Sequence, residues 1–183
     1  MWQKMLQVGN GGGGGNGVYP LRIINSANVK AVWSTEEESP VDSGFFSSDG
    51  RFVALRSVDG SNKTAWMPPN TRNTEHYIIY KLVKLSNIQK ISFIPATADP
   101  SNYNATFNVY FSETKDFGSA VATKSFTINK INNMWTAQDV SKKVEIDIPN
   151  VSAQYIKIGI TTTSGTATYS VGIGEIEAIG TEI

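Results

Sequence analysis

The chain has 183 residues, and its 16 basic and 16 acidic side chains give a formal net charge of zero at pH 7. That balance argues against a nucleic-acid-binding module, which carries a basic surface, and the absence of cysteine excludes disulfides, thiolate metal sites and cysteine nucleophiles. A chain of this length can bury about two-thirds of its unfolded surface, enough for one domain with its own core.

The first segment is a short arm followed by a glycine-rich stretch. Residues 1–8 lack the apolar run of about 7–15 residues that a signal peptide needs, and no segment reaches the length of a membrane span. Residues 10–17 read Asn-Gly-Gly-Gly-Gly-Gly-Asn-Gly, and no Gly-Lys-Ser/Thr follows, as a phosphate-binding loop would require. We therefore expect residues 1–17 to form an arm with a polyglycine hinge, and residues 18–183 to form the folded domain.

From residue 18 onward the hydrophobic pattern is that of β-strands. Apolar residues alternate in Phe107–Phe111 and Val144–Ile148, and the three isoleucines of Tyr155–Ile160 share one face opposite Lys157. No window of helical length keeps an apolar stripe. The expected strands are Tyr19–Ile24, Phe52–Leu55, Tyr77–Leu82, Ile88–Ile94, Phe107–Phe111, Val121–Ile128, Val144–Ile148, Tyr155–Ile160 and Ile173–Ile179. Turn residues such as Pro149–Asn150 separate them, which predicts an all-β fold, a two-sheet antiparallel jelly-roll-like β-sandwich.

Two distant stretches carry oxygen donors. Ser57–Trp66 is a polar, glycine-bearing turn that ends in a tryptophan, and Gly174–Glu177 is a short β pattern with two carboxylates. Such donors suit a hard cation, which takes roughly 6 to 8 oxygens at about 2.3–2.6 Å. The two stretches can form one site only if a sandwich brings them together.

The order of these motifs resembles the discoidin, or galactose-binding-like, domain family, which includes coagulation-factor membrane-binding domains and bacterial sugar-binding modules. The resemblance spans Ala31–Gly180. It rests on Asp-Gly-x-x-x-Thr-x-Trp at Asp59, the apolar pair Tyr77–Leu82 and Ile88–Ile94, Tyr-Ile-Lys-Ile at Tyr155, and Gly-Glu-Ile-Glu-Ala-Ile-Gly at Gly174.

The resemblance implies a structural calcium held by Asp59, Ser61, Thr64 and Glu175, with no organic cofactor. Ser61 stands where a second acidic residue often follows the Asp-Gly pair, so fewer carboxylates imply weaker calcium affinity. The alternative is that Asp59 only stabilises its own turn and that Trp66 is a core aromatic residue.

The resemblance also implies a ligand site in loops at one end of the sandwich, where an aromatic ring stacks on a sugar and polar side chains bind its hydroxyls. Phe45 and Phe46 alternatively cap the core or lie in a protein interface; the same ambiguity applies to Trp135, and His76 alternatively is a strand-edge residue. The candidate ligand-binding residues are Trp33, Phe45, Phe46, Arg51, Arg72, His76, Trp135 and Tyr169.

Catalysis is not expected. His76 is the only histidine, no Gly-x-Ser-x-Gly motif is present, and Glu36–Glu38 is a solvated charge run. We therefore predict a non-catalytic interaction module.

The leading hypothesis for its role is a structural component of a phage virion (tail, baseplate or fibre). The arm would dock into the particle, and the sandwich would bind a neighbouring subunit or a host surface glycan. The missing signal peptide, the absence of cysteine and the high Asn, Thr and Ser content favour it, and it predicts a homo-oligomer located in the virion. The alternative is a carbohydrate-binding module of a larger glycan-processing protein, with an extracellular or cytoplasmic location.

Overall fold

The computed structural model describes residues 21–22, 29–34, 57–61, 64–68, 74–97, 103–131, 143–162 and 171–183. These residues form seven antiparallel strands and a single short 3₁₀ turn at Ser57–Val58. No helix in this part of the chain is long and apolar enough to cross a membrane. The strands are β1 (Leu21–Arg22), β2 (Val29–Ser34), β3 (His76–Thr97), β4 (Tyr103–Ser112), β5 (Ala122–Ile131), β6 (Val144–Thr162) and β7 (Val171–Glu182).

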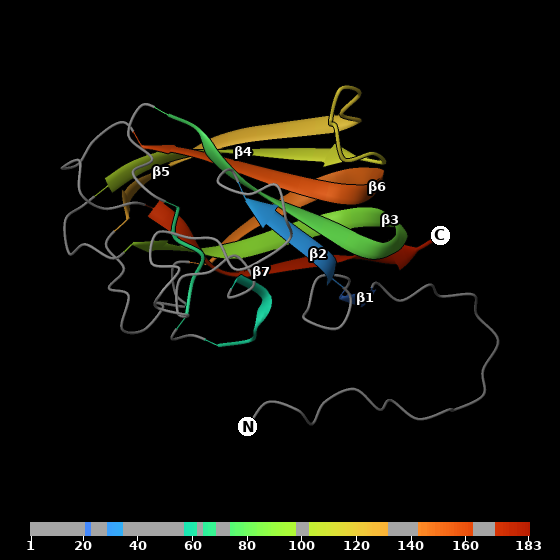
Figure 1. Ribbon diagram of the computed structural model, residues 1–183, viewed down its shortest axis with the longest axis horizontal. Helices are drawn as coiled ribbons and strands as arrows, with labels where there is room; N and C mark the ends of the chain where they lie inside the picture. Colours follow the sequence, from blue (N-terminus) through green and yellow to red (C-terminus); the bar gives the residue numbers. More distant parts are fainter. Residues whose placement is uncertain are drawn as a thin grey trace.

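Strands β3 and β6 are long, with 22 and 19 residues, and each belongs to both layers of the domain. They pair from His76 with Ile160 to Lys81 with Tyr155, and after an irregularity again from Ser86 with Ala153 to Phe93 with Val144. In Figure 1, β3 doubles back at this irregularity. The ribbon of two strands is therefore folded over on itself.

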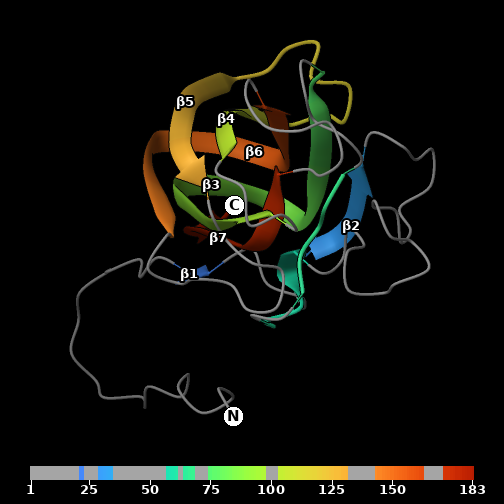
Figure 2. The same cartoon turned by 90° about the vertical axis from the view of Figure 1, so that its left-hand side faces the viewer.

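The folded ribbon produces two facing sheets. The first layer contains β2, the first half of β3, the second half of β6, β4 and β5. The second layer contains the second half of β3, the first half of β6, β7 and β1. Figure 2 shows the layers end-on, with β4 and β5 above β7. The predicted two-sheet β-sandwich is confirmed.

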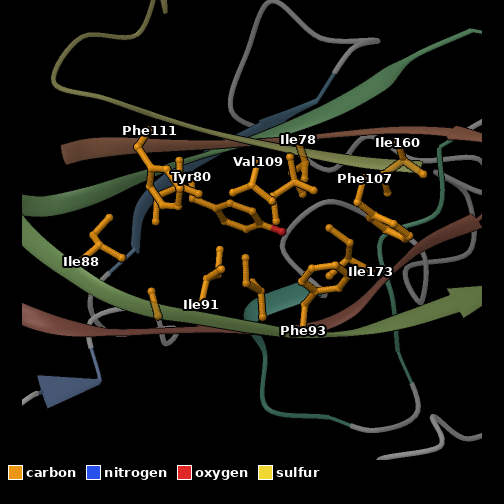
Figure 3. Close-up of a cluster of buried hydrophobic side chains, with 14 of the residues drawn as sticks. Ile78, Tyr80, Ile88, Ile91, Phe93, Phe107, Val109, Phe111, Ile160 and Ile173 are labelled. Carbon is orange, nitrogen blue, oxygen red and sulfur yellow. The ribbon is translucent and has the colours of Figure 1, made fainter. Parts of the chain in front are cut away.

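The core fills the space between the layers. Phe107, Val109 and Phe111 of β4 are fully buried, as the alternation predicts, and they face Ile91 and Phe93 of β3 (Figure 3). The Phe93 and Phe107 ring centroids lie 5.0 Å apart. Burial of each such side chain contributes roughly 1.5–3 kcal/mol to folding.

The strand boundaries differ from the prediction in two places. The turn expected at Pro149–Asn150 is wrong, because β6 runs through it. Val151 pairs with Ile88 and Asp147 with Lys90, so these two residues lie in a bulge between the two pairs, and Asn150 has a φ of 43°. Strand β2 was not predicted. Of the expected Tyr19–Ile24 strand the described part is β1, whereas Phe52–Leu55 lies outside the described residues.

Most strand ends gather at one end of the sandwich, which we call the loop end. Paired residues at the starts and ends of strands mark it: His76 with Ile160, Ala105 with Thr162, Tyr103 with Ile131, and Thr97 with Val171. It lies at the left of Figure 1. The opposite end holds the fold in β3, the β4–β5 hairpin and the C-terminus, where the Ile183 N–H donates to the Leu85 carbonyl at 3.0 Å.

Candidate functional site

The Asp59 loop is held by the Asp59 carboxylate itself. Oδ1 accepts a hydrogen bond from Ser61 N at 2.9 Å, and the Thr64 hydroxyl lies 2.9 Å from both carboxylate oxygens. Gly60 has a φ of 76°, a conformation that favours glycine. The side-chain-stabilised turn offered as the alternative interpretation is therefore present, and its carboxylate faces inward over the loop.

Glu175 of β7 meets this loop from the other end of the sequence. Its Oε1 accepts a hydrogen bond from Gly60 N at 2.8 Å, although the two residues are 115 positions apart. The pKa of Glu175 is raised to about 8. Burial is the main cause, the hydrogen bond with Asp59 and the negative charge of Asp59 add to it, and the Gly60 and Ser61 N–H groups oppose it. Two carboxyl groups thus share one half-buried site, and at neutral pH Glu175 keeps its proton.

A short bridge attaches the loop to β7. The Trp66 N–H donates to the Ile173 carbonyl at 2.8 Å, and the Ile173 N–H donates to the Trp66 carbonyl at 2.9 Å. Gly172 makes this possible, because a Cβ at this position would overlap the Trp66 carbonyl oxygen. Trp66 is fully buried, as expected for a core aromatic residue.

The start of the loop is fixed from inside the core. The Tyr80 hydroxyl donates to Ser57 Oγ at 2.8 Å, and both residues are fully buried. Burial raises the pKa of Tyr80 well above its usual range, so this phenol stays neutral. This pair was not predicted, since Tyr80 is one of many apolar strand positions in the sequence and nothing local connects it to Ser57.

The four predicted metal ligands therefore lie together. Asp59, Ser61 and Thr64 share the loop, the Thr64 hydroxyl also lies 3.4 Å from the Ser61 carbonyl oxygen, and Glu175 closes the site. Among the described residues there is no cluster of three or more acidic or histidine side chains. Glu177, two positions further along β7, does not join the site, because it binds Lys143 at 2.9 Å. The donor set is oxygen only, which fits a hard cation held by two carboxylates, carbonyls and water.

Of the predicted ligand-binding residues, the described part of the chain contains His76 and the backbone of Trp33. His76 is half-buried at the start of β3, at the loop end, and Trp33 pairs with Ile79. Phe45, Phe46, Arg51, Arg72, Trp135 and Tyr169 lie outside the described residues. Their segments join the described strands at or next to the loop end: residues 35–56 follow Ser34, and residues 132–142 and 163–170 follow the ends of β5 and β6.

Solved structures with the same fold include several sugar-binding modules. A family 32 module from a family 31 glycoside hydrolase of Clostridium perfringens superposes with a TM-score of 0.58 at 18% identity, covering 88% of this chain and 95% of that one. A chitosan-binding module of a Paenibacillus chitosanase/glucanase has a TM-score of 0.53 at 18% identity, covering 84% and 97%. A family 32 module of AlyQ, solved with 4,5-unsaturated mannuronic acid, has a TM-score of 0.53 at 14% identity, covering 86% and 97%.

A search of curated proteins found no match. The F5/8 type C domain matches residues 33–173, which agrees with the resemblance seen in the motifs and with the expectation of a non-catalytic domain. The chain therefore belongs to the F5/8 type C, or discoidin, domain family.

Proposed function

We propose that this domain is a carbohydrate-binding module whose sugar site lies at the loop end of the sandwich. The observation that carries the proposal is the F5/8 type C match over residues 33–173. Solved domains of the same fold are described as binding chitosan, pectin and galactose, which supports the same function.

The topology supports this position for the site. His76 lies at the loop end, and the segments that carry Arg72, Trp135 and Tyr169 are attached to strands that begin or end there. Aromatic rings provide apolar faces for pyranose C–H groups, and arginine and histidine provide donors for hydroxyls. We assign the ligand-binding role to Trp33, Phe45, Phe46, Arg72, His76, Trp135 and Tyr169.

A glycan array followed by calorimetry on the full chain tests this assignment. We expect at least one glycan to bind, and we expect Trp135→Ala and His76→Ala to weaken binding by about tenfold or more, as loss of a stacked ring or charged hydrogen bond does. Lys84→Ala is the matched control, because Lys84 pairs with Glu182 at the far end. Absence of binding to every glycan, or equal loss in the control, would reject the proposal.

We further propose that Asp59, Ser61, Thr64 and Glu175 hold a calcium ion with a structural role. The pairing of two carboxyl groups at the mouth of an oxygen-lined loop supports it, since a cation would replace the proton that Glu175 otherwise keeps. Only two carboxylates contribute, so we expect an affinity toward the weak end of the calcium range.

Calorimetric titration with CaCl₂ tests the calcium site. Asp59→Asn should abolish binding, whereas Asp116→Asn should not. Asp116 is a close control, because its carboxylate also accepts a hydrogen bond from the N–H two residues later, at Gly118 (3.3 Å). Binding that survives Asp59→Asn would place the ion elsewhere.

The virion role stays a separate prediction from the sequence. It depends on the arm, residues 1–17, which lies outside the described residues. Light scattering on the full chain and on a version lacking residues 1–17 tests it: an oligomer that becomes a monomer on truncation supports assembly through the arm, and a monomer in both cases rejects it.

A further inference from the structure

The outward surface of the first layer carries an unusual set of side chains. Along β4, β6 and β3, every second residue points away from the core, and we call this surface the sheet face. It lies on the strands themselves and not at the loop end. Its rings and ammonium groups belong to Tyr77, Lys81, Tyr110, Tyr155 and Lys157, and Phe117 of the β4–β5 hairpin joins them.

Lys157 lies among three aromatic rings. Its Nζ is 4.3 Å from the ring centroid of Tyr110, 5.0 Å from that of Phe117 and 5.6 Å from that of Tyr77. Lys81 repeats the arrangement one strand away, with Nζ 5.4 Å from the Tyr155 centroid. In the described part of the chain neither ammonium group forms an ion pair with a carboxylate, unlike Lys84, Lys90 and Lys143, each of which does.

The backbone of the β4–β5 hairpin places one of these rings, that of Phe117, against Lys157. Phe117 has a φ of 53°, a left-handed conformation that is rare for a bulky side chain. Asp116 fixes this turn by accepting hydrogen bonds from the Thr114 hydroxyl at 2.6 Å and from Gly118 N at 3.3 Å. Strain of this kind is concentrated at functional sites, and here its effect is to keep the ring against Lys157.

Polar groups next to the rings complete the sheet face. Asn108 donates to Glu75 Oε1 at 2.8 Å, and the Glu75 side chain lies over Gly159, where a Cβ would overlap it. The hydroxyls of Thr106 and Thr127 lie 3.1 Å apart on β4 and β5. The acidic group beside the cluster is thus engaged with an amide, and the cationic groups are left beside rings and hydroxyls.

We propose that the sheet face is a second binding site, and that its ligand is a polyuronate chain. This inference rests on the proposed carbohydrate-binding function and adds a ligand class and a separate location. Tyrosine and phenylalanine rings stack on sugar C–H faces. The carboxylate carried by each uronate ring then pairs with Lys157 or Lys81. Both lysines are half-buried, and a cation–π contact at such a site is weaker than a charge-assisted hydrogen bond, so a lysine exchanges its ring for a carboxylate at little cost.

Binding of soluble polygalacturonate to the full-length protein, followed by calorimetry and by affinity electrophoresis, tests the proposal. We expect Lys157→Gln to weaken binding by about ten- to hundredfold, the loss of a charged hydrogen bond. Lys157→Arg should restore most of it, and raising NaCl should weaken wild-type binding. Lys143→Gln is the matched control, because Lys143, immediately before β6, is already paired with Glu177.

Phe117→Gly keeps the proposal testable even if Lys157 contributes to folding. Glycine adopts the positive φ without strain, so the hairpin is retained while the ring is removed. We expect this variant to melt no earlier than wild type and to bind polygalacturonate about tenfold more weakly.

The outcomes separate this proposal from the one at the loop end. Loss of polyuronate binding in Lys157→Gln and Phe117→Gly, but not in Trp135→Ala, supports the sheet face. If only Trp135→Ala and His76→Ala lose binding, the carbohydrate-binding function stands and the sheet-face site is rejected. Two results with the wild-type protein also overturn the uronate assignment. One is binding to a sulfated glycan that contains no uronate but not to polygalacturonate, and the other is binding to neutral polysaccharides as tight as to polygalacturonate.

Discussion

Replacing Glu175 with glutamine removes the group that becomes charged beside Asp59 as the pH rises through about 8. Burial raises the pKa of Glu175 from 4.5 to about 8, so within this pH range the native state holds a proton that the unfolded chain releases. The stability from that proton is fully present below about pH 4.5 and is lost as the pH rises through about 8. Glutamine still accepts from Gly60 N and still donates toward Asp59, so it acts as a carboxyl group that cannot lose its proton.

The size of the effect follows from the pKa. A change from 4.5 to about 8 corresponds to roughly 5 kcal/mol for a fully buried group. Glu175 is only half-buried, and solvent screening reduces this value. Without calcium, we expect Glu175→Gln to be more stable than wild type by about 2 kcal/mol at pH 9, and to match it near pH 5. For a domain of this size the difference at pH 9 raises the melting temperature by about 4–8 °C.

Thermal unfolding in EDTA from pH 5 to pH 9 measures this difference. Glu177→Gln serves as the control, because it lies on the same strand but pairs with Lys143 at 2.9 Å and should keep the wild-type pH profile. Adding calcium at pH 8 should reverse the order, stabilising wild type but not Glu175→Gln. Parallel pH profiles for wild type and Glu175→Gln would refute the coupling between Glu175 and Asp59.

Three further substitutions test how the core holds the site. Phe107→Ala should lower the free energy of unfolding by about 3–5 kcal/mol in urea titrations, since it empties a fully buried position; a loss below about 1 kcal/mol would contradict the packing. Gly172→Ala should lower the free energy of unfolding by about 1–3 kcal/mol and weaken calcium binding, because the added Cβ pushes Trp66 away from β7. Unchanged calcium binding in calorimetry would argue against a role for the bridge between Trp66 and Ile173. Tyr80→Phe should lower the free energy of unfolding in urea titrations by about 1 kcal/mol, because it removes the hydrogen bond to Ser57. Unchanged stability would show that this hydrogen bond is dispensable.

The alternating strands could be predicted because burial imposes a period of two. Ile156, Ile158 and Ile160 are fully buried while Lys157 points outward, as their spacing implies. The fold in β3 could not be predicted from such a period. Val83 and Lys84 are exposed at the fold, and nothing in their local sequence distinguishes a turn between two strands from a strand that changes sheets.

The candidate cation site was predicted in part. Asp59 and Glu175 belong to recognisable motifs, and the structure brings them together. The contacts that fix the loop, from Tyr80 to Ser57 and from Trp66 to Ile173, join residues whose types carry no local signal of pairing. Lys157 and its rings were missed for the same reason, because the cluster exists only after β3, β4 and β6 lie side by side. The loop-end ligand residues stay predictions.

The folded ribbon of β3 and β6 also sets the timing of folding during synthesis. His76 cannot pair with Ile160 until β4, β5 and most of β6 have been made, and at about 5–20 residues per second β3 waits several seconds for β6. During that interval β2 is already available to pair with Ile78 and Leu82, but the apolar face of β3 has no opposing layer. Pairings between such distant positions also slow folding, to milliseconds or seconds after release. A newly made chain therefore leaves the apolar face of β3 uncovered for several seconds and completes the Asp59 loop last, when β7 arrives.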